Sequence, residues 1–108
     1  MPAVTNKTTT LINILKVDPS SQDKLVDMIN DSIDSVIHQL PGWVSTNLVA
    51  STDGNAVIII SRWRSADHIQ AMRLDPRMVA YFEEIRAIAS FESILGTSVR
   101  AEEARIEA

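Results

Sequence analysis

The amino-acid sequence predicts an α+β domain of the ferredoxin-like type, with strands and helices in the order β-α-β-β-α-β. Four short runs alternate between apolar and other side chains, as half-buried strands do. Two longer stretches repeat apolar residues every three or four positions, which is typical of helices that bury one side. The dipeptide Asp53-Gly54, between the second and third runs, is typical of a tight β-hairpin. We therefore expect a four-stranded antiparallel sheet with both helical regions on one face.

The first strand and the first helix occupy the first 40 or so residues. Residues 10–17 alternate as a strand, and residues 18–21 read Asp-Pro-Ser-Ser, a turn and cap sequence that starts a helix. Pro41-Gly42 is expected to end that helix. Its buried side is predicted to comprise Leu25, Met28, Ile29, Ile33, Val36, Ile37 and Leu40.

The second and third strands form the predicted hairpin. Residues 43–50 alternate well enough for a strand, and residues 57–63 are an aliphatic strand that ends in a tryptophan. The turn between them, at residues 51–55, is rich in residues that favour tight turns. These two strands are therefore expected to pair with each other.

The second helical region is predicted in two pieces. Ser65 can cap a helix over residues 66–74, and Asp75-Pro76 interrupts it because proline lacks the backbone N–H that a helix interior needs. A second piece is predicted over residues 77–89, and residues 91–99 form the last strand. The apolar side of the second piece comprises Met78, Tyr81, Phe82, Ile85 and Ile88.

The chain is expected to form one domain with short ends. At 108 residues it has the length of a common single domain. Residues 1–9 are predicted to be a flexible N-terminal segment and residues 10–99 the ferredoxin-like domain. Residues 100–108, which are charged and rich in alanine, are expected to form a short helix or a frayed C-terminal tail.

The sheet is predicted to be apolar on both faces. Ile12 and Ile14 on the first strand, and Ile58 and Ile60 on the third, point away from the face that the helices cover. An open face rich in isoleucine is a large apolar patch, which soluble monomers rarely expose. A second copy of the chain is the simplest cover, so we expect a homodimer.

Composition and charge exclude several classes of protein. The net charge of −4 and the absence of a Lys/Arg cluster argue against a nucleic-acid partner. With no cysteine the chain has no disulfide, thiol nucleophile or zinc–thiolate site. No run reaches membrane-spanning length, so we expect a cytoplasmic protein without a membrane partner. No metal-ligand spacing or glycine-rich phosphate loop is present, so we predict no metal and no cofactor.

Asn13 and Trp63 are the strongest candidates for chemistry. Asn13 interrupts an apolar strand face, and its amide could hold a carbonyl or enolate oxygen or simply bond backbone or water. Trp63 carries one N–H donor at the end of the third strand, and it could serve a ligand or only the core. The alternation fixes the face of each strand but not the alignment between strands, so whether they share a cavity stays open.

Three further residues could each have either a role at the site or a purely structural role. His68 could accept a proton close to Trp63, or face solvent. Tyr81 and Arg86 could reach a cavity between helix and sheet. Tyr81 could equally be a core residue with its hydroxyl at the rim, and Arg86 a solvated residue with a buried stem. Met72 fits helical core spacing without any cofactor.

The residues that carry these features together resemble the antibiotic biosynthesis monooxygenase family. The resemblance covers residues 10–99 and keeps the order of the elements. No single motif is sharp, but their order and spacing are fairly specific. The segments that carry it are Asn13–Val17, Gln39–Val44, Ser51–Gly54, Arg62–Ser65, Ala71-Met72, Asp75–Met78 and Phe91-Glu92. The resemblance implies a dimeric α+β barrel built from ferredoxin-like subunits.

The resemblance also implies an activity and a site. It implies oxidation of anthrone- or quinol-type polyaromatic substrates by O₂ to a quinone, without metal or flavin, in polyketide or other aromatic natural-product tailoring. Asn13 and Trp63 match the catalytic positions of such enzymes, whereas Ile59 stands where they usually have a second asparagine. Arg73 stands where related haem-degrading proteins keep a histidine, so haem is not implied. Around the catalytic pair we expect the substrate to contact Ile59, Ser61, His68, Met72, Tyr81, Phe82 and Arg86.

Two other functions fit the same residues. One is a polyketide cyclase or isomerase that uses the shape of the pocket and one or two donors, which Ile59 favours because it supplies no hydrogen bond. The other is a small dimeric ligand-binding module without catalysis, since a fold does not fix a function.

Overall fold

The computed structural model describes residues 8–104 and confirms the predicted order of elements and the α+β ferredoxin-like class. Residues 1–7 of the expected N-terminal segment and residues 105–108 of the expected tail lie outside the described residues. The elements are β1 (Thr9–Val17), the 3₁₀ turn η2 (Pro19–Ser21), α1 (Gln22–Ser35), the 3₁₀ turn η3 (Ile37–Gln39), β2 (Trp43–Ala50), β3 (Ala56–Trp63), α2 (Ala66–Leu74), α3 (Pro76–Arg86) and β4 (Ala89–Gly96).

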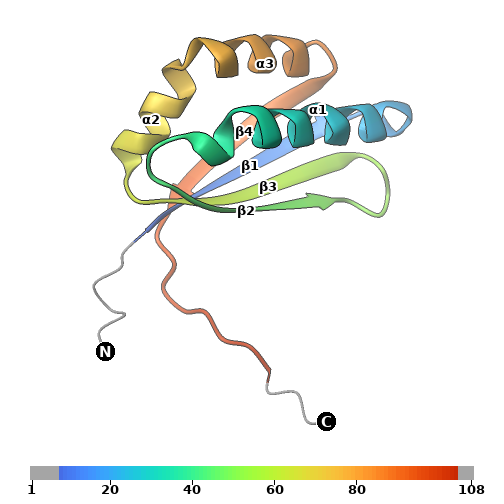
Figure 1. The fold of residues 1–108 in the computed structure, drawn as a ribbon. Coiled ribbons are helices and arrows are strands. Elements are labelled where there is room, and N and C mark those ends of the chain that lie inside the picture. The colour runs from blue at the N-terminus through green and yellow to red at the C-terminus, as the bar shows by residue number, and fades with distance from the viewer. Residues whose placement is uncertain (1–7, 105–108) are drawn as a thin grey trace.

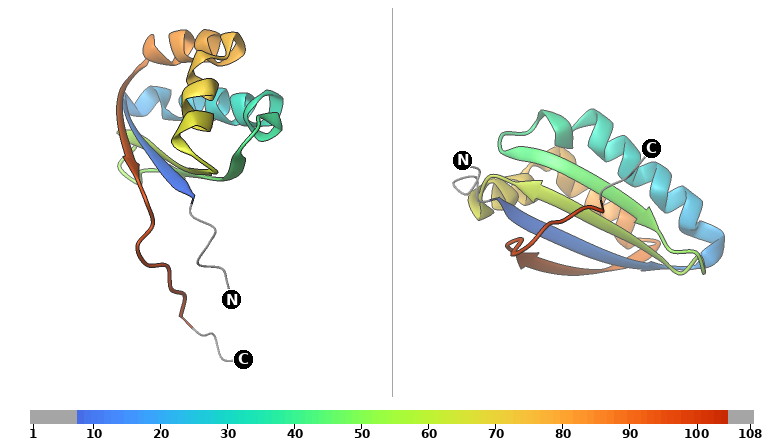
Figure 2. Two further views of the ribbon diagram at one scale, coloured as in Figure 1. Left: turned by 90° about the vertical axis from the view of Figure 1, so that its left-hand side faces the viewer. Right: turned by 90° about the horizontal axis from the view of Figure 1, so that it is seen from below.

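The four strands form one antiparallel sheet in the order β2-β3-β1-β4. All three α-helices lie on one face of this sheet (Figure 1). Seen from the opposite side, the sheet faces the viewer and the helices lie behind it (Figure 2, right). The site described below lies between the two layers, because the side chains of β1 and β3 that alternate toward the helices are the buried ones.

Local sequence explains where most elements begin. The Asp18 carboxylate accepts a hydrogen bond from the Ser20 backbone N–H and starts the turn before α1. At the hairpin, Gly54 has φ +84°, a conformation open to glycine, and Asp53 accepts from the Asn55 N–H at 2.9 Å. The Ser65 hydroxyl caps α2, and the Asp75 carboxylate caps α3. Hydrogen bonds from Arg77 also lower the pKa of Asp75 to about 2.

Three elements differ from the prediction by more than one residue at an end. The first helix was expected to continue to residue 40, but α1 ends at Ser35. There the Ser32 hydroxyl bonds back to the Ile29 carbonyl at 2.7 Å, and Val36 leaves helical geometry. Likewise, α3 ends at Arg86 rather than residue 89. Finally, β4 spans Ala89–Gly96 rather than residues 91–99, because its ladder with β1 ends at the pair Thr10–Gly96.

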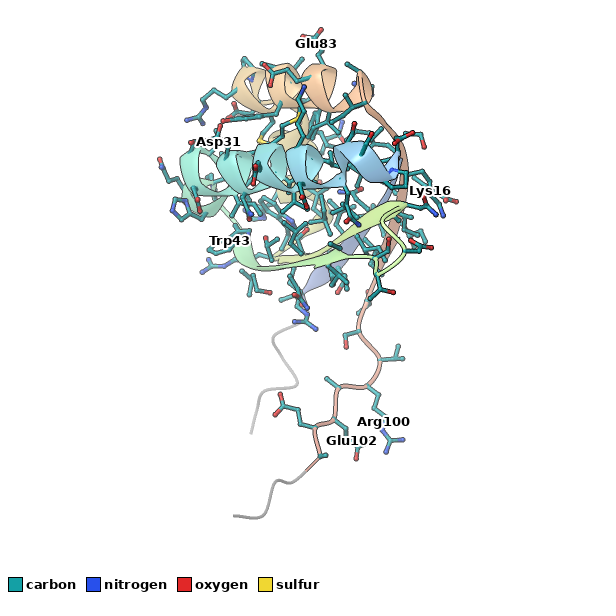
Figure 3. All side chains as sticks on the ribbon, turned by 90° about the vertical axis from the view of Figure 1, so that its right-hand side faces the viewer. Lys16, Asp31, Trp43, Glu83, Arg100 and Glu102 are labelled. Atoms are coloured by element: carbon teal, nitrogen blue, oxygen red, sulfur yellow. The ribbon has the colours of Figure 1, made fainter. Side chains whose placement is uncertain are left out.

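Residues 97–104 include the described part of the C-terminal tail, and they do not form the short helix that was one of its two expected structures. They are exposed, carry no helix or strand, and run away from the sheet on the side opposite the helices (Figures 1 and 3). Arg100 and Glu102 form an ion pair within this segment. Exposed ion pairs contribute little to stability.

The buried core divides into two clusters. The first centres on Trp63, which is 1% exposed, and comprises Leu11, Val36, Trp63, Ile69, Met72 and Met78. The second comprises Leu15, Val17, Leu25, Ile29, Val57 and Ile85. Leu11, Leu15 and Val57 face the helices, as their alternation predicted. A cavity lined by members of both clusters lies between them.

The face of the sheet without helices is apolar, as predicted. Ile12, Ile14, Ile58 and Ile60 point to this side and are only half-buried within the subunit. On the outer strands of the same face, Val49 is 40% exposed and Ile94 is 49% exposed. The whole width of the sheet therefore presents apolar groups on the side opposite the helices.

Candidate active site

An inner cavity lies between the sheet and the helices. It holds about 40 Å³ and is lined mainly by aliphatic and aromatic side chains. Its walls include six residues predicted for the site: Asn13, Ile59, Ser61, Trp63, Met72 and Phe82. Asn13 and Trp63 thus share one cavity, which alternation alone could not establish. A water molecule needs roughly 10–15 Å³ of such space, so this cavity has room for a few water-sized groups but not for a ring system.

A wider outer cavity of about 300 Å³ adjoins the inner one. Leu11, Asn13, Met72, Phe82 and Phe91 line both cavities, so they form the boundary between the two. The outer cavity adds polar side chains, namely Arg73, Arg86 and Ser93. Since Arg86 and Ser93 are exposed, solvent reaches this second space.

The amide of Asn13 is held in one orientation at this boundary. Its Oδ1 accepts a hydrogen bond from the Ser93 hydroxyl, and the two residues are opposite each other on β1 and β4. With Oδ1 used in this way, the Nδ2 group remains as a donor of two hydrogen bonds. It donates to no acceptor within residues 8–104. Asn13 therefore offers N–H donors where the two cavities meet.

The indole of Trp63 is engaged within the protein. Its Nε1 donates to the Ser61 Oγ at 3.1 Å, and both side chains are buried, at 1% and 6% exposure. The family resemblance implied a catalytic Trp63, whose N–H could serve a ligand. In the structure it meets Ser61 instead, because residues two apart on a strand share a face. Trp63 still forms part of the cavity wall through its ring.

Two predicted contact residues line neither cavity. The His68 ring packs against Gly42, where an added Cβ would lie 2.2 Å from its Cγ, and its Nδ1 is 2.8 Å from the Ser65 Oγ. The Tyr81 hydroxyl donates to the Asp31 carboxylate at 2.5 Å and so links α3 to α1. Figure 3 shows Asp31 on the part of α1 that faces α3. This hydrogen bond to a carboxylate raises the pKa of Tyr81.

Arg86 has the position that the sequence suggested, at the mouth of the outer cavity. Its guanidinium carbon lies 5.5 Å from the centre of the Phe91 ring, a cation–π arrangement. Arg73, for which no binding role was predicted, stands at the same mouth. Neither arginine pairs with a carboxylate in the described part of the chain. The mouth therefore carries positive charge.

Sequence reasoning missed several residues of the site. It gave no role to Ser93, although Phe91, Ser93 and Leu95 alternate on one face of β4. It also missed Thr46, which lines the inner cavity and whose Oγ1 accepts from the Trp43 Nε1 at 2.8 Å. The apolar residues that α1 and η3 supply, Ile29, Ile33 and Ile37, were predicted as core and also line the cavity.

Residues 8–104 contain no group of three histidine, aspartate or glutamate side chains that could hold a metal ion. In the same residues, no helix is both long enough and apolar enough to cross a membrane.

Comparisons with known proteins identify the family of the chain. Residues 8–84 match the family model described as antibiotic biosynthesis monooxygenase. A curated relative, tetracenomycin-F1 monooxygenase of Streptomyces glaucescens, is 34% identical over 80 residues, which cover 74% of this chain and 71% of the relative. The name of this relative describes it as a monooxygenase of tetracenomycin F1.

Solved structures show the same fold. A monooxygenase from the gene ActVA-Orf6 of Streptomyces coelicolor, in complex with nanaomycin D, superposes with a TM-score of 0.78 and 26% identity over 94% of this chain and 96% of that one. SnoaB of Streptomyces nogalater, a cofactor-independent oxygenase, superposes with a TM-score of 0.74 and 19% identity over 88% of this chain and 96% of its own.

Proposed function

The chain belongs to the antibiotic biosynthesis monooxygenase family, and we propose that it is a cofactor-independent monooxygenase that oxidises an anthrone- or quinol-type polyaromatic substrate with O₂ to a quinone. The observation that carries this proposal is the position of Asn13. Its free amide N–H groups lie where a solvent-accessible cavity meets a small apolar one. An electron-rich ring in the outer cavity and O₂ in the inner cavity would therefore meet beside the amide N–H donors of Asn13.

The reaction needs little from the protein beyond placement and charge stabilisation. Loss of a proton from the reacting carbon to solvent at the mouth leaves an electron-rich carbanion. One electron passes to O₂, giving a substrate radical and superoxide, which recombine to form a C–O bond. The resulting peroxide takes up a proton. Loss of water then breaks the O–O bond and the remaining C–H bond, leaving one oxygen atom in the quinone and one in water.

Asn13 has the main electrostatic role in this proposal. As the substrate loses its proton, negative charge develops on the oxygen conjugated with the reacting carbon. The Nδ2 group of Asn13 donates to that oxygen, and its orientation is already set by Ser93. Donors fixed before the reaction stabilise such charge without reorganising. The apolar walls nearby strengthen the interaction because they exclude water.

The ring system lies in the outer cavity, since the inner one is too small for it. Met72, Phe82 and Phe91 offer it apolar and aromatic contacts, with Ile59 behind Asn13 in the inner wall. The polar edge of the substrate faces Arg73 and Arg86, whose positive charge suits phenolate or carboxylate oxygens. This placement gives roles to four of the predicted contact residues, while His68 and Tyr81 line neither cavity and bond Ser65 and Asp31 instead.

A cyclase or isomerase of polyketide-like intermediates is the second candidate. Ile59, directly opposite Asn13 in the β1–β3 ladder, is the observation that favours it. An apolar side chain there leaves Asn13 as the only amide donor among the residues that line the inner cavity. One donor with a shaped pocket suffices to hold a substrate for ring closure.

Oxygen consumption separates these functions. We expect the purified protein, incubated in air with the anthrone dithranol and a metal chelator, to consume one O₂ for each quinone formed. The physical reason is that the reaction above uses both oxygen atoms of O₂ once. Oxygen uptake is measured with an electrode and the quinone by its absorbance. Conversion without oxygen uptake would favour the cyclase, and binding without conversion would favour the non-enzymatic module.

We further propose that the protein is a homodimer whose subunits pack through the open faces of their sheets. Light scattering should then give twice the mass of one chain, and Ile60→Asp should give the monomer, because a charge at the centre of this apolar face loses its hydration on association. Val79→Asp is the matched control: Val79 is 41% exposed but lies on α3, on the other side of the sheet. A wild-type protein that is monomeric at micromolar concentration would contradict the proposal.

A further inference from the structure

Two hydroxyl groups stand side by side in the wall of the inner cavity. Ser61 on β3 and Thr46 on β2 are opposite each other in the sheet, and both line the cavity. Directly opposed residues of an antiparallel pair have Cβ atoms about 4.5–5.5 Å apart. The outer cavity includes neither residue. Of the two cavities, these residues therefore border only the small inner one.

Each of the two hydroxyls accepts a hydrogen bond from a different tryptophan. Trp63 Nε1 donates to the Ser61 Oγ at 3.1 Å, and Trp43 Nε1 donates to the Thr46 Oγ1 at 2.8 Å. The two tryptophans are themselves opposite each other in the β2–β3 ladder. The arrangement is thus repeated on neighbouring strands.

The proton of each hydroxyl remains available. A hydroxyl has one O–H donor and two lone pairs, and the indole N–H uses only a lone pair. Within residues 8–104 neither hydroxyl donates to an acceptor. Ser61 is buried and Thr46 is half-buried. Donors withdrawn from solvent normally have a partner, so two such hydroxyls beside one cavity indicate a ligand that accepts hydrogen bonds.

We propose that Ser61 and Thr46 form a hydrogen-bonding site for the reduced dioxygen unit, first superoxide and then peroxide. The inference rests on the proposed function. The inner cavity holds about 40 Å³, which suits a diatomic molecule, and its apolar walls suit neutral O₂ before reduction. When O₂ accepts an electron, the two hydroxyls donate to the anion. The indole N–H groups support them, because a hydroxyl that accepts a hydrogen bond becomes a stronger donor.

The position of this site complements that of Asn13. Ile59 is opposite Asn13, and Ser61 is two residues further along the same face of β3. Diagonal neighbours of this kind lie roughly 7–8 Å apart, with their Cβ atoms somewhat closer. A peroxide bonded to the reacting carbon can therefore reach Ser61 while the substrate oxygen stays at Asn13. The two sites act on different negative charges in the same reaction.

The test removes each hydroxyl and compares the dependence of turnover on O₂ with the affinity for the aromatic substrate. Thr46→Val and Ser61→Ala should each lower kcat/KM for O₂ roughly 10- to 100-fold, the effect of losing one hydrogen bond to a charged group. The Kd of dithranol, titrated under nitrogen, should change less than about threefold. Thr46→Ser and Ser61→Thr keep the hydroxyl and should recover most of the kcat/KM.

Every outcome is decisive. If Thr46→Val and Ser61→Ala consume O₂ as fast as the wild type, the hydroxyls only satisfy the two indoles and the proposal is wrong. The proposal is also wrong if Thr46→Ser lowers kcat/KM for O₂ as much as Thr46→Val does, since the hydroxyl would then not matter. If Ser61→Ala fails to fold, this comparison of the two Thr46 variants still tests the proposal. If the wild type itself consumes no O₂, the proposed function fails, and this site with it.

Discussion

Replacing Asn13 with leucine is expected to lower kcat by ~10²–10³ while the domain stays folded. Leucine has nearly the shape of asparagine but no donor, so it leaves the charge on the substrate oxygen without its hydrogen bond. Asn13 is only half-buried, and leucine suits the apolar face it shares with Leu11 and Leu15. The measurement is steady-state oxygen uptake with dithranol, together with a thermal unfolding curve for each variant.

Ser93→Ala provides the control for this effect. It leaves the Asn13 amide in place but removes the hydroxyl that orients it, so kcat should fall only up to about tenfold, the effect of one neutral hydrogen bond. Ser93→Thr keeps the hydroxyl on an exposed strand position and should restore the rate. A result in which Asn13→Leu turns over like the wild type would remove the amide from the reaction.

The regular elements could be predicted because their signals are local. Alternation, the Asp-Gly turn and the caps at Ser65 and Asp75 depend on neighbouring residues alone. One of the boundaries that differed, the end of β4, depends on a strand far away in the sequence. This strand ends at Gly96 because its ladder with β1 ends at the pair Thr10–Gly96, more than 80 residues apart in the sequence. Nothing near Gly96 in the sequence carries that information.

The site could be predicted only in part for the same reason. Alternation placed Asn13, Ser61 and Trp63 on the helix side, but the pairing with Ser93 depends on the register of β1 with β4. Alternation could not place Thr46 on the helix side, because β2 contains a β-bulge before it. The ladder shifts between Trp43 and Ser45, so Trp43 and Thr46, three residues apart, face the same side. Strict alternation would have placed them on opposite faces.

Replacing Trp63 with alanine is expected to reduce the free energy of unfolding by about 3–5 kcal/mol. Trp63 is the largest of the fully buried side chains, at 1% exposure, and it packs with Leu11, Ile69 and Met72. Alanine would leave a void next to the inner cavity. The sheet and helices cannot move together enough to fill both spaces, so the lost packing is not recovered. Denaturant unfolding at one fixed protein concentration measures the loss, because association changes the apparent stability.

Trp43→Ala is the matched control for this loss, since Trp43 is half-buried and packs at the edge of the same cluster. It should reduce the free energy of unfolding less than Trp63→Ala does, and an equal or larger reduction would contradict the central place of Trp63 in the core.

The variant Trp63→Phe separates the packing role of Trp63 from its role in the reaction. It keeps most of the ring but leaves the Ser61 hydroxyl without its donor, so it should unfold much closer to the wild type than alanine does. Its turnover should still fall roughly tenfold, because the Ser61 proton is no longer directed into the cavity.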